Sequence, residues 1–119
     1  MAMLLSTFIA LSLLTIGAVV ILMVRLVAAG SLERNAAFGI RTSATKHSDQ
    51  AWAAGHRAAQ PLSRVLGITA IVFAVVILAL GFTKSMVAVA VASVMAYLVT
   101  FVLIGLVARR ANAAARAVS

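Results

Sequence analysis

The side chains of this sequence that could take part in acid–base, nucleophilic or metal chemistry gather in one short stretch. The only carboxylates are Glu33 and Asp49, and the only histidines are His47 and His56. The histidines are nine residues apart, which matches no standard metal-ligand spacing, and the chain has no cysteine. No nucleophile–base motif surrounds Ser48, which is better explained as the N-cap of a helix. We therefore expect a protein that is not an enzyme and that has no metal and no cofactor.

An arginine in the same stretch is a better candidate for binding than for catalysis. Arg41 follows Gly39 at two residues' distance, and a guanidinium held in a structured loop requires a carboxylate or a phosphate partner. That partner could be internal, either Glu33 or Asp49, or it could be a lipid headgroup or another protein. The sequence leaves these alternatives open.

A short helix over residues 49–59 is predicted to follow this loop. Ser48 is a suitable N-cap, and Asp49 places a negative charge in the first turn, where the helix dipole favours it. We expect this helix to lie at the membrane surface and the loop to fold back beneath the helices that cross the membrane. Pro61 then falls in the first turn of the next membrane helix, where its missing N–H costs nothing.

One face of the short helix is predicted to meet the preceding loop. Trp52 and His56 are four residues apart and share a face, whereas Arg57 points elsewhere. We expect Trp52 at the depth of the lipid headgroups, as is usual for interfacial tryptophans. If Gly39 adopts a backbone conformation that a Cβ disfavours, the chain can turn so that Arg41 faces Trp52 and His56.

The composition places these residues in a membrane protein. Of 119 residues, 65% are apolar and only 10% are charged, and the mean hydropathy is +1.18; a soluble domain carries about 25% charged residues. Three uncharged stretches are each about as long as the ~20 residues that cross a bilayer. We predict an all-α, integral membrane three-helix bundle in a single domain over residues 1–119. Its parts are spans at about 3–25, 61–83 and 85–108, a structured cytoplasmic loop at 26–60 with the short interfacial helix, and a basic tail at 109–119. Gly30 is expected to end the first helix, and the turn at 83–85 is short enough to make the last two spans a tight antiparallel hairpin.

The charges predict how the spans are oriented. Ten basic residues against two acidic ones give a net charge of +8. With three spans, nine of the ten basic residues lie on the side of the long loop and the tail, and Lys84 alone lies on the other. This bias predicts an outside N-terminus and a cytoplasmic C-terminus. Basic residues beside apolar spans also favour anionic lipid headgroups as partners, and no nucleic acid is expected.

Small residues mark one face of the third span. Ala88, Ala92 and Ala96 recur at intervals of four, which lets helix backbones approach closely. This face could pack inside the three-helix bundle, or it could be the contact of a homo-oligomer.

The loop also resembles the SdpI family of small bacterial membrane proteins. The matching residues, at fixed spacing, are Asn35, Gly39, Ile40, Arg41, Thr42, Thr45, Ser48, Trp52, His56 and Arg57. The family is named for an immunity protein against a sporulation-delaying toxin, and its signature lies in a loop followed by two transmembrane helices. The resemblance implies toxin immunity or membrane signalling through the basic loop, with a toxin or a repressor as the protein partner. The alternative is an accessory subunit that packs against a larger membrane protein complex.

The residue pattern of the loop and the resemblance together give eight candidates for partner binding. These candidates are Asn35, Gly39, Arg41, Thr42, Thr45, Trp52, His56 and Arg57.

Overall fold

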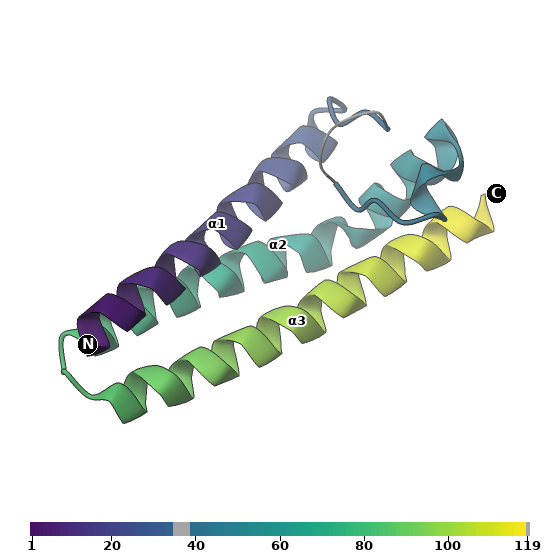
Figure 1. The fold of residues 1–119 in the computed structure, drawn as a ribbon. Helices are drawn as coiled ribbons and strands as arrows, with labels where there is room; N and C mark the ends of the chain where they lie inside the picture. Colours follow the sequence, from purple (N-terminus) through teal and green to yellow (C-terminus); the bar gives the residue numbers. More distant parts are fainter. Residues whose placement is uncertain (35–38, 119) are drawn as a thin grey trace.

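The chain folds into three long helices that form a membrane-type bundle. The computed structural model describes residues 1–34 and 39–118. Its elements are α1 (Ala2–Ala28), the 3₁₀ helix η1 (Thr45–His47), α2 (Asp49–Gly81) and α3 (Met86–Ala117), and these residues contain no strand (Figure 1). Each long helix is long and apolar enough to span a membrane. The predicted all-α, three-helix architecture is therefore confirmed.

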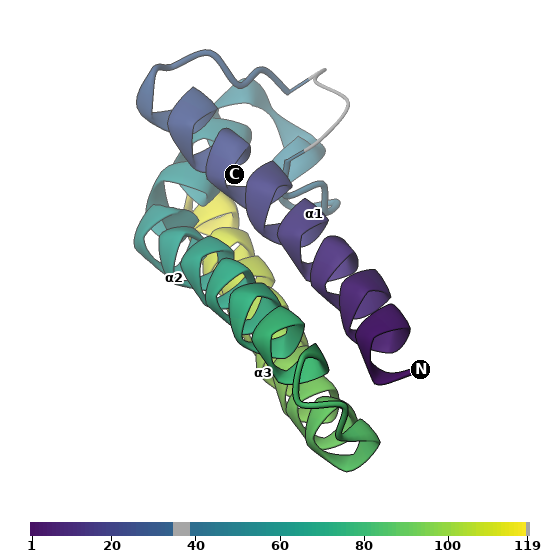
Figure 2. The same ribbon diagram turned by 90° about the vertical axis from the view of Figure 1, so that its left-hand side faces the viewer.

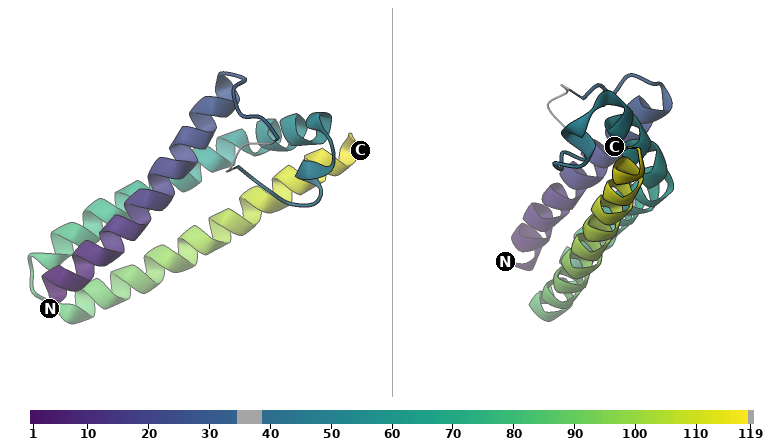
Figure 3. Two further views of the ribbon diagram at one scale, coloured as in Figure 1. Left: turned by 45° about the horizontal axis from the view of Figure 1, so that its top comes forward. Right: turned by 90° about the vertical axis from the view of Figure 1, so that its right-hand side faces the viewer.

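The central element of the bundle is α2, which packs along both of the other long helices, while α1 and α3 touch each other little (Figure 2). At the end that carries the α2–α3 turn, all three helices share a core that includes Leu13, Ile77, Val89 and Ala96. Towards the other end, α1 diverges from α3 (Figure 3). The bundle is therefore closed at the turn end and parted at the end that carries the long loop. We call this second end the basic end.

Large apolar side chains cover the outside of the bundle. Phe8, Val87 and Phe101 are 66%, 74% and 63% exposed. Apolar surface of this extent is typical of helices that face hydrocarbon and is unfavourable in water. Together with the length of the three helices, it makes the chain a multi-pass membrane protein.

The end of α1 is a helix stop that the sequence predicted. Gly30 has φ +71°, a conformation that favours glycine. Its N–H donates to the carbonyl of Val27, and the N–H of Ser31 donates to that of Leu26. These two bonds make a Schellman motif, which satisfies carbonyls that the helix end would leave unpaired.

The connection between α2 and α3 is as tight as the sequence predicted. Lys84 takes a left-handed conformation, with φ +61°, and its N–H donates to the carbonyl of Gly81. The Ser85 side chain then caps α3 by accepting from the N–H of Ala88. The two helices therefore form an antiparallel hairpin.

The predicted break between a short helix at 49–59 and the second span is wrong. Ser48 caps α2 by accepting from the N–H of Ala51, as expected, but the helix then runs without interruption to Gly81. Pro61 lies in its interior instead of in a first turn. The proline ring suits the helical φ, and its missing N–H affects only one helical hydrogen bond. Burial of Ala51 and Ala59 favours the continuous helix because it packs this part of α2 against the rest of the protein.

The residues predicted as a basic tail also differ, because α3 continues through them to Ala117. Ala111 and Ala115 are fully buried on this extension. Of the small residues on the span itself, Ala96 is fully buried, Ala92 is partly buried against the core, and Ala88 lies half-buried beside it.

Candidate functional site

At the basic end, the loop folds onto the beginning of α2 and the end of α3. We call residues 39–59 the cap; they comprise the loop from Gly39, η1 and the first turns of α2. The arrangement brings the two halves of the signature together, although about ten residues separate them in the sequence. The cap was expected to be structured, and its described residues are.

Gly39 fixes the path of the loop. Its φ is +128°, and a Cβ at this position would lie 2.9 Å from Cη2 of Trp52 and 3.0 Å from Nε2 of His56. Both the backbone conformation and the space therefore require glycine. The expectation of a glycine-dependent turn towards Trp52 and His56 is confirmed.

His56 joins the loop to α2 through both of its ring nitrogens. The N–H of Ile40 donates to Nε2 at 2.8 Å, so this nitrogen accepts, and Nδ1 therefore carries the proton and donates to the carbonyl of Trp52 at 2.8 Å. The ring is 3% exposed and lies against the Trp52 ring, with centroids 4.1 Å apart. Burial lowers the pKa of His56, which lies before the charge-free stretch of α2. The site thus holds a neutral imidazole.

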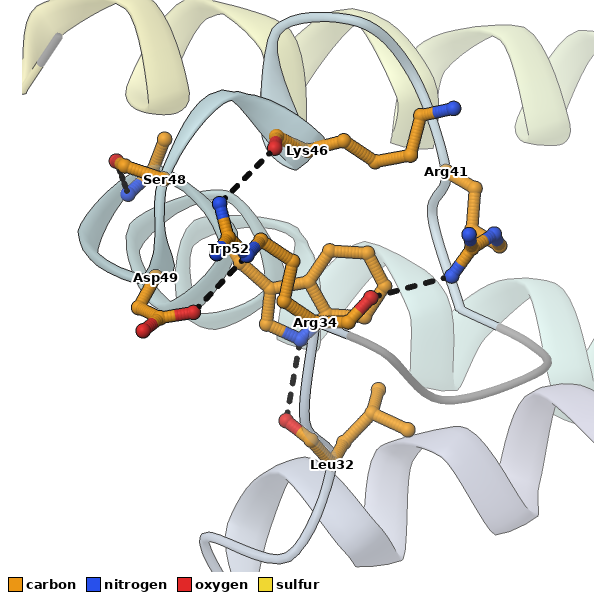
Figure 4. Close-up of polar contacts among 8 residues, drawn as sticks. Leu32, Arg34, Arg41, Lys46, Ser48, Asp49 and Trp52 are labelled. Atoms are coloured by element: carbon orange, nitrogen blue, oxygen red, sulfur yellow. Dashed lines mark hydrogen bonds and ion pairs between the residues drawn. The ribbon is translucent and has the colours of Figure 1, made fainter.

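Trp52 ties the residues after α1 to α2. Its Nε1 donates to the carbonyl of Leu32 at 3.1 Å, and the residue is 3% exposed (Figure 4). The ring is therefore buried by contacts within the cap, and its depth in the membrane stays a prediction. A buried indole requires a partner for its N–H, and a loop carbonyl supplies it.

Two threonines brace the loop and attach it to α3. The Thr42 N–H donates to Oγ1 of Thr45 at 3.1 Å, and the Thr45 N–H donates to Oγ1 of Thr42 at 3.2 Å. Thr45 also donates to the carbonyl of Ile40, and Thr42 donates to Oδ1 of Asn112 on α3. Thr45 is fully buried. The threonines therefore position the loop, and Asn112 is a hydrogen-bond partner of the loop that the sequence did not predict.

Arg41 lies at the surface of the cap and faces Trp52, as predicted. Its NH1 donates to the carbonyl of Arg34 at 3.2 Å, and its Cζ is 6.0 Å from the centroid of the Trp52 ring (Figure 4). Asp49, one of its expected partners, forms an ion pair with Arg34 at 3.0 Å. The two side chains of that pair are 37% and 89% exposed, so it contributes at most about 1 kcal/mol. Arg34 therefore acts mainly by orienting the loop around Arg41.

A further contact holds α1 against α2 at the basic end. The Gln60 side chain donates through Nε2 to the carbonyl of Val24 at 2.6 Å. Neither Gln60 nor Arg34 was singled out by the sequence, because their partners lie more than ten residues away and no local pattern predicts them.

The other candidates lie outside this network. Arg57 is exposed on α2, beside a small pocket that it lines together with Gly30 and Leu32. Asn35 lies outside the described residues. Within the ranges that the structure describes, no three histidine or carboxylate side chains gather into a group that could hold a metal.

The signature therefore divides into two kinds of residue. Gly39, Thr45, Trp52 and His56 pack or bond within the cap, and Arg41 presents a charge at its surface. Such an arrangement suits binding of an anionic or polar partner more than bond-breaking chemistry.

Comparison with known proteins adds one match. The family described as the SdpI/YfhL protein family matches residues 31–107, which include the cap, all of α2 and most of α3. Comparison with curated proteins and with solved structures finds no match. The matched segment is well over half of the 119 residues and contains the whole signature. The chain belongs to the SdpI/YfhL family.

Proposed function

We propose that this protein is a non-enzymatic membrane protein that protects its cell from a membrane-active toxin or relays a signal through the cap. Membership of the SdpI/YfhL family suggests a membrane immunity-type protein. The observation that supports a role for the cap is its construction: Gly39, Trp52 and His56 hold a loop whose exposed cation is Arg41. A rigidly held guanidinium is suited to recognise a carboxylate or a phosphate on a partner.

The charge distribution supports a partner on the cytoplasmic side. Nine of the ten basic residues lie towards the basic end, and the positive-inside bias places such an end in the cytoplasm. A repressor held at the membrane would meet the cap directly there. A toxin that acts in the bilayer would meet the helices below it.

The test is survival of a toxin-sensitive bacterial strain that expresses the full chain and is exposed to the sporulation-delaying toxin. Wild-type protein is expected to protect. Arg41→Ala is expected to abolish protection while the protein still reaches the membrane in equal amount, because insertion depends on hydrophobicity. Lys46→Ala removes a neighbouring exposed cation and is expected to protect like the wild type. Protection by Arg41→Ala equal to the wild type would contradict the role of the cap.

A second candidate function is that of an accessory subunit of a larger membrane protein complex. The observation that favours it is Gly105, which lies exposed on α3 with no atom within 4 Å of where its Cβ would be. A small residue on an outer face lets another helix approach closely. In this case Gly105→Leu would release co-purifying membrane proteins in mild detergent, and the toxin assay would show no protection by the wild type.

A further inference from the structure

The divergence of α1 from α3 leaves an apolar cleft at the basic end. Its volume is about 350 Å³. The walls are Val19, Val20 and Met23 from α1 and Ile104, Val107 and Ala108 from α3. Val19 and Ile104 are 47% and 40% exposed, so the cleft opens onto the side of the bundle. In a membrane, that side faces lipid.

The cleft lies just inside the level of the flanking charges. Met23 precedes Arg25 by two residues and Val19 precedes it by six, which places them about 3 Å and about 9 Å deeper along the helix. On α3, Ala108 immediately precedes Arg109. Apolar walls keep water out of such a space. The hydrocarbon core of the membrane begins just inside the flanking charges, so the upper part of a lipid acyl chain is the apolar group available to fill the cleft.

The mouth of the cleft is formed by the cap. Gly39, Ile40, Arg41 and Thr42 line its end, so the guanidinium of Arg41 lies beside an apolar space. Ile40 packs against the buried cluster that includes Leu66 and holds the loop in this place. The contacts of Arg41 with the Arg34 carbonyl and the Trp52 ring orient its side chain at the mouth.

We propose that this cleft binds an anionic membrane lipid, with one acyl chain between α1 and α3 and its phosphate at Arg41. The chemistry of the cleft matches the two parts of such a molecule: apolar walls within the membrane and a permanent cation at headgroup level. Charge complementarity favours the anionic lipid, because the protein carries +8 and nearly all of its basic residues lie towards this end. The site shares Arg41 with the proposed function, but lipid binding requires no toxin and can be measured without one.

The test is lipid retention by the purified full-length protein, measured by native mass spectrometry after incubation with equal amounts of phosphatidylglycerol and phosphatidylcholine. Wild-type protein is expected to retain phosphatidylglycerol about tenfold more than phosphatidylcholine. Both headgroups carry a phosphate, but the choline ammonium of phosphatidylcholine offsets its charge and is repelled beside Arg41, so only phosphatidylglycerol makes the full charge-assisted contact. Arg41→Gln is expected to remove most of this preference and still retain lipid. Lys46→Gln, which removes a nearby exposed cation, is expected to keep it.

Filling the cleft tests the site of the acyl chain. Ala108→Leu is expected to lower retention of both lipids several-fold, whereas Ala90→Leu, the same change on the outer face of α3, is expected to leave it unchanged. Circular dichroism and size-exclusion chromatography check that each variant folds. If Ala108→Leu does not fold, the lipid preference of Arg41→Gln still tests the proposal.

Three results would overturn the proposal. The first is equal retention of the two lipids by the wild type. The second is an unchanged preference in Arg41→Gln, which would place the phosphate elsewhere. The third is a wild type that retains neither lipid but retains the sporulation-delaying toxin peptide in a separate incubation, which would assign the cleft to a peptide. Because the lipid incubation contains no toxin, its outcome is separate from that of the survival assay.

Discussion

A single residue, Gly39, determines the path of the loop through its backbone conformation and its lack of a side chain. Its φ of +128° lies in a region that other residues rarely adopt, and the Trp52 and His56 rings occupy the space where a side chain would begin. The position therefore combines a backbone requirement with a packing requirement. Neither neighbouring ring can yield easily, because both are buried and hydrogen-bonded.

Gly39→Ala is expected to destabilise the cap by about 1–3 kcal/mol, since the backbone conformation becomes strained and the Cβ meets both rings. Thermal unfolding in detergent, followed by the fluorescence of the single tryptophan, measures the loss. Gly105→Ala is the control, because that glycine lies in a helix with open space around it. It is expected to be neutral or stabilising by up to about 1 kcal/mol. Equal effects of the two changes would refute the special role of Gly39.

His56 makes the cap sensitive to acid. Its Nε2 accepts from the Ile40 N–H, so a proton on this nitrogen would oppose the donor and place a charge in a buried site. The folded-state pKa is lowered from the ordinary value of 6.5 by burial. The unfolded chain therefore takes up a proton first as the pH falls. The stability of the cap is present above pH 6.5 and is lost as the pH falls through the lowered pKa.

The corresponding measurement is the unfolding temperature as a function of pH between neutrality and mild acid. It is expected to fall with acidification in the wild type, and His56→Gln is expected to have a lower but flatter profile because the titrating group is gone. His47→Gln is the matched control, since His47 is exposed on η1. Its unfolding temperature should fall with acidification as steeply as that of the wild type. If the unfolding temperature of His56→Gln still falls as steeply, the acid sensitivity belongs to another group.

At the scale of the elements, the extension of α3 completes the cap. Ala111 and Ala115 are fully buried, and a Cβ on Gly55 of α2 would lie 3.0 Å from the Ala111 carbonyl. Asn112 accepts from Thr42 on the same face. The small residues let the two helices approach closely, and the loop is fastened across them.

Ala111→Leu is expected to destabilise this contact by about 1–3 kcal/mol, because the larger side chain overpacks a site with no free space. Loosening of the cap is measured by the rate of tryptic cleavage at Arg41 and Lys46. Ala113→Leu is the same change on the exposed face of the same helix and is expected to stay within about 0.5 kcal/mol. Faster cleavage in Ala113→Leu than in Ala111→Leu would argue against docking of the loop on this face.

At the scale of the whole molecule, the distribution of basic residues and the shape of the bundle distinguish the same two ends. The turn end is narrow, closed by a shared core and carries only Lys84 between its spans, whereas the other end is parted and basic. Because basic loops are retained on the cytoplasmic side, the concentration of basic residues at one end predicts the orientation of the bundle in the membrane.

A reporter enzyme that is active only in the cytoplasm is expected to be active when it is fused after Ser119. The same reporter fused after Thr83, in the turn between α2 and α3, is expected to be inactive, and a reporter active only outside the cytoplasm should give the opposite pattern. The reverse result at both positions would show that the basic end faces outwards. That outcome would also remove the argument for a cytoplasmic partner.

The sequence by itself determined the three apolar helices, the tight α2–α3 hairpin, the glycine stop after α1, the Ser48 cap and the turn at Gly39. Each of these depends on residues that are close in sequence: a run of some 20 apolar side chains, a glycine after a helix, a serine three residues before the N–H that it accepts from. Transfer to hydrocarbon and capping are local energies, so a local pattern predicts them.

Only the tertiary structure decided how the basic end is built. The passage of α2 through Pro61, the helical continuation of α3, the burial of Trp52 and the Arg34–Asp49 pair were all missed. Each depends on a partner far along the chain, such as Asn112 for Thr42 or Val24 for Gln60. Proline locally opposes a helix interior, and an alanine-rich segment does not by itself fix where its helix ends. Burial against another element therefore outweighs propensity, and the partner is known only once the chain has folded.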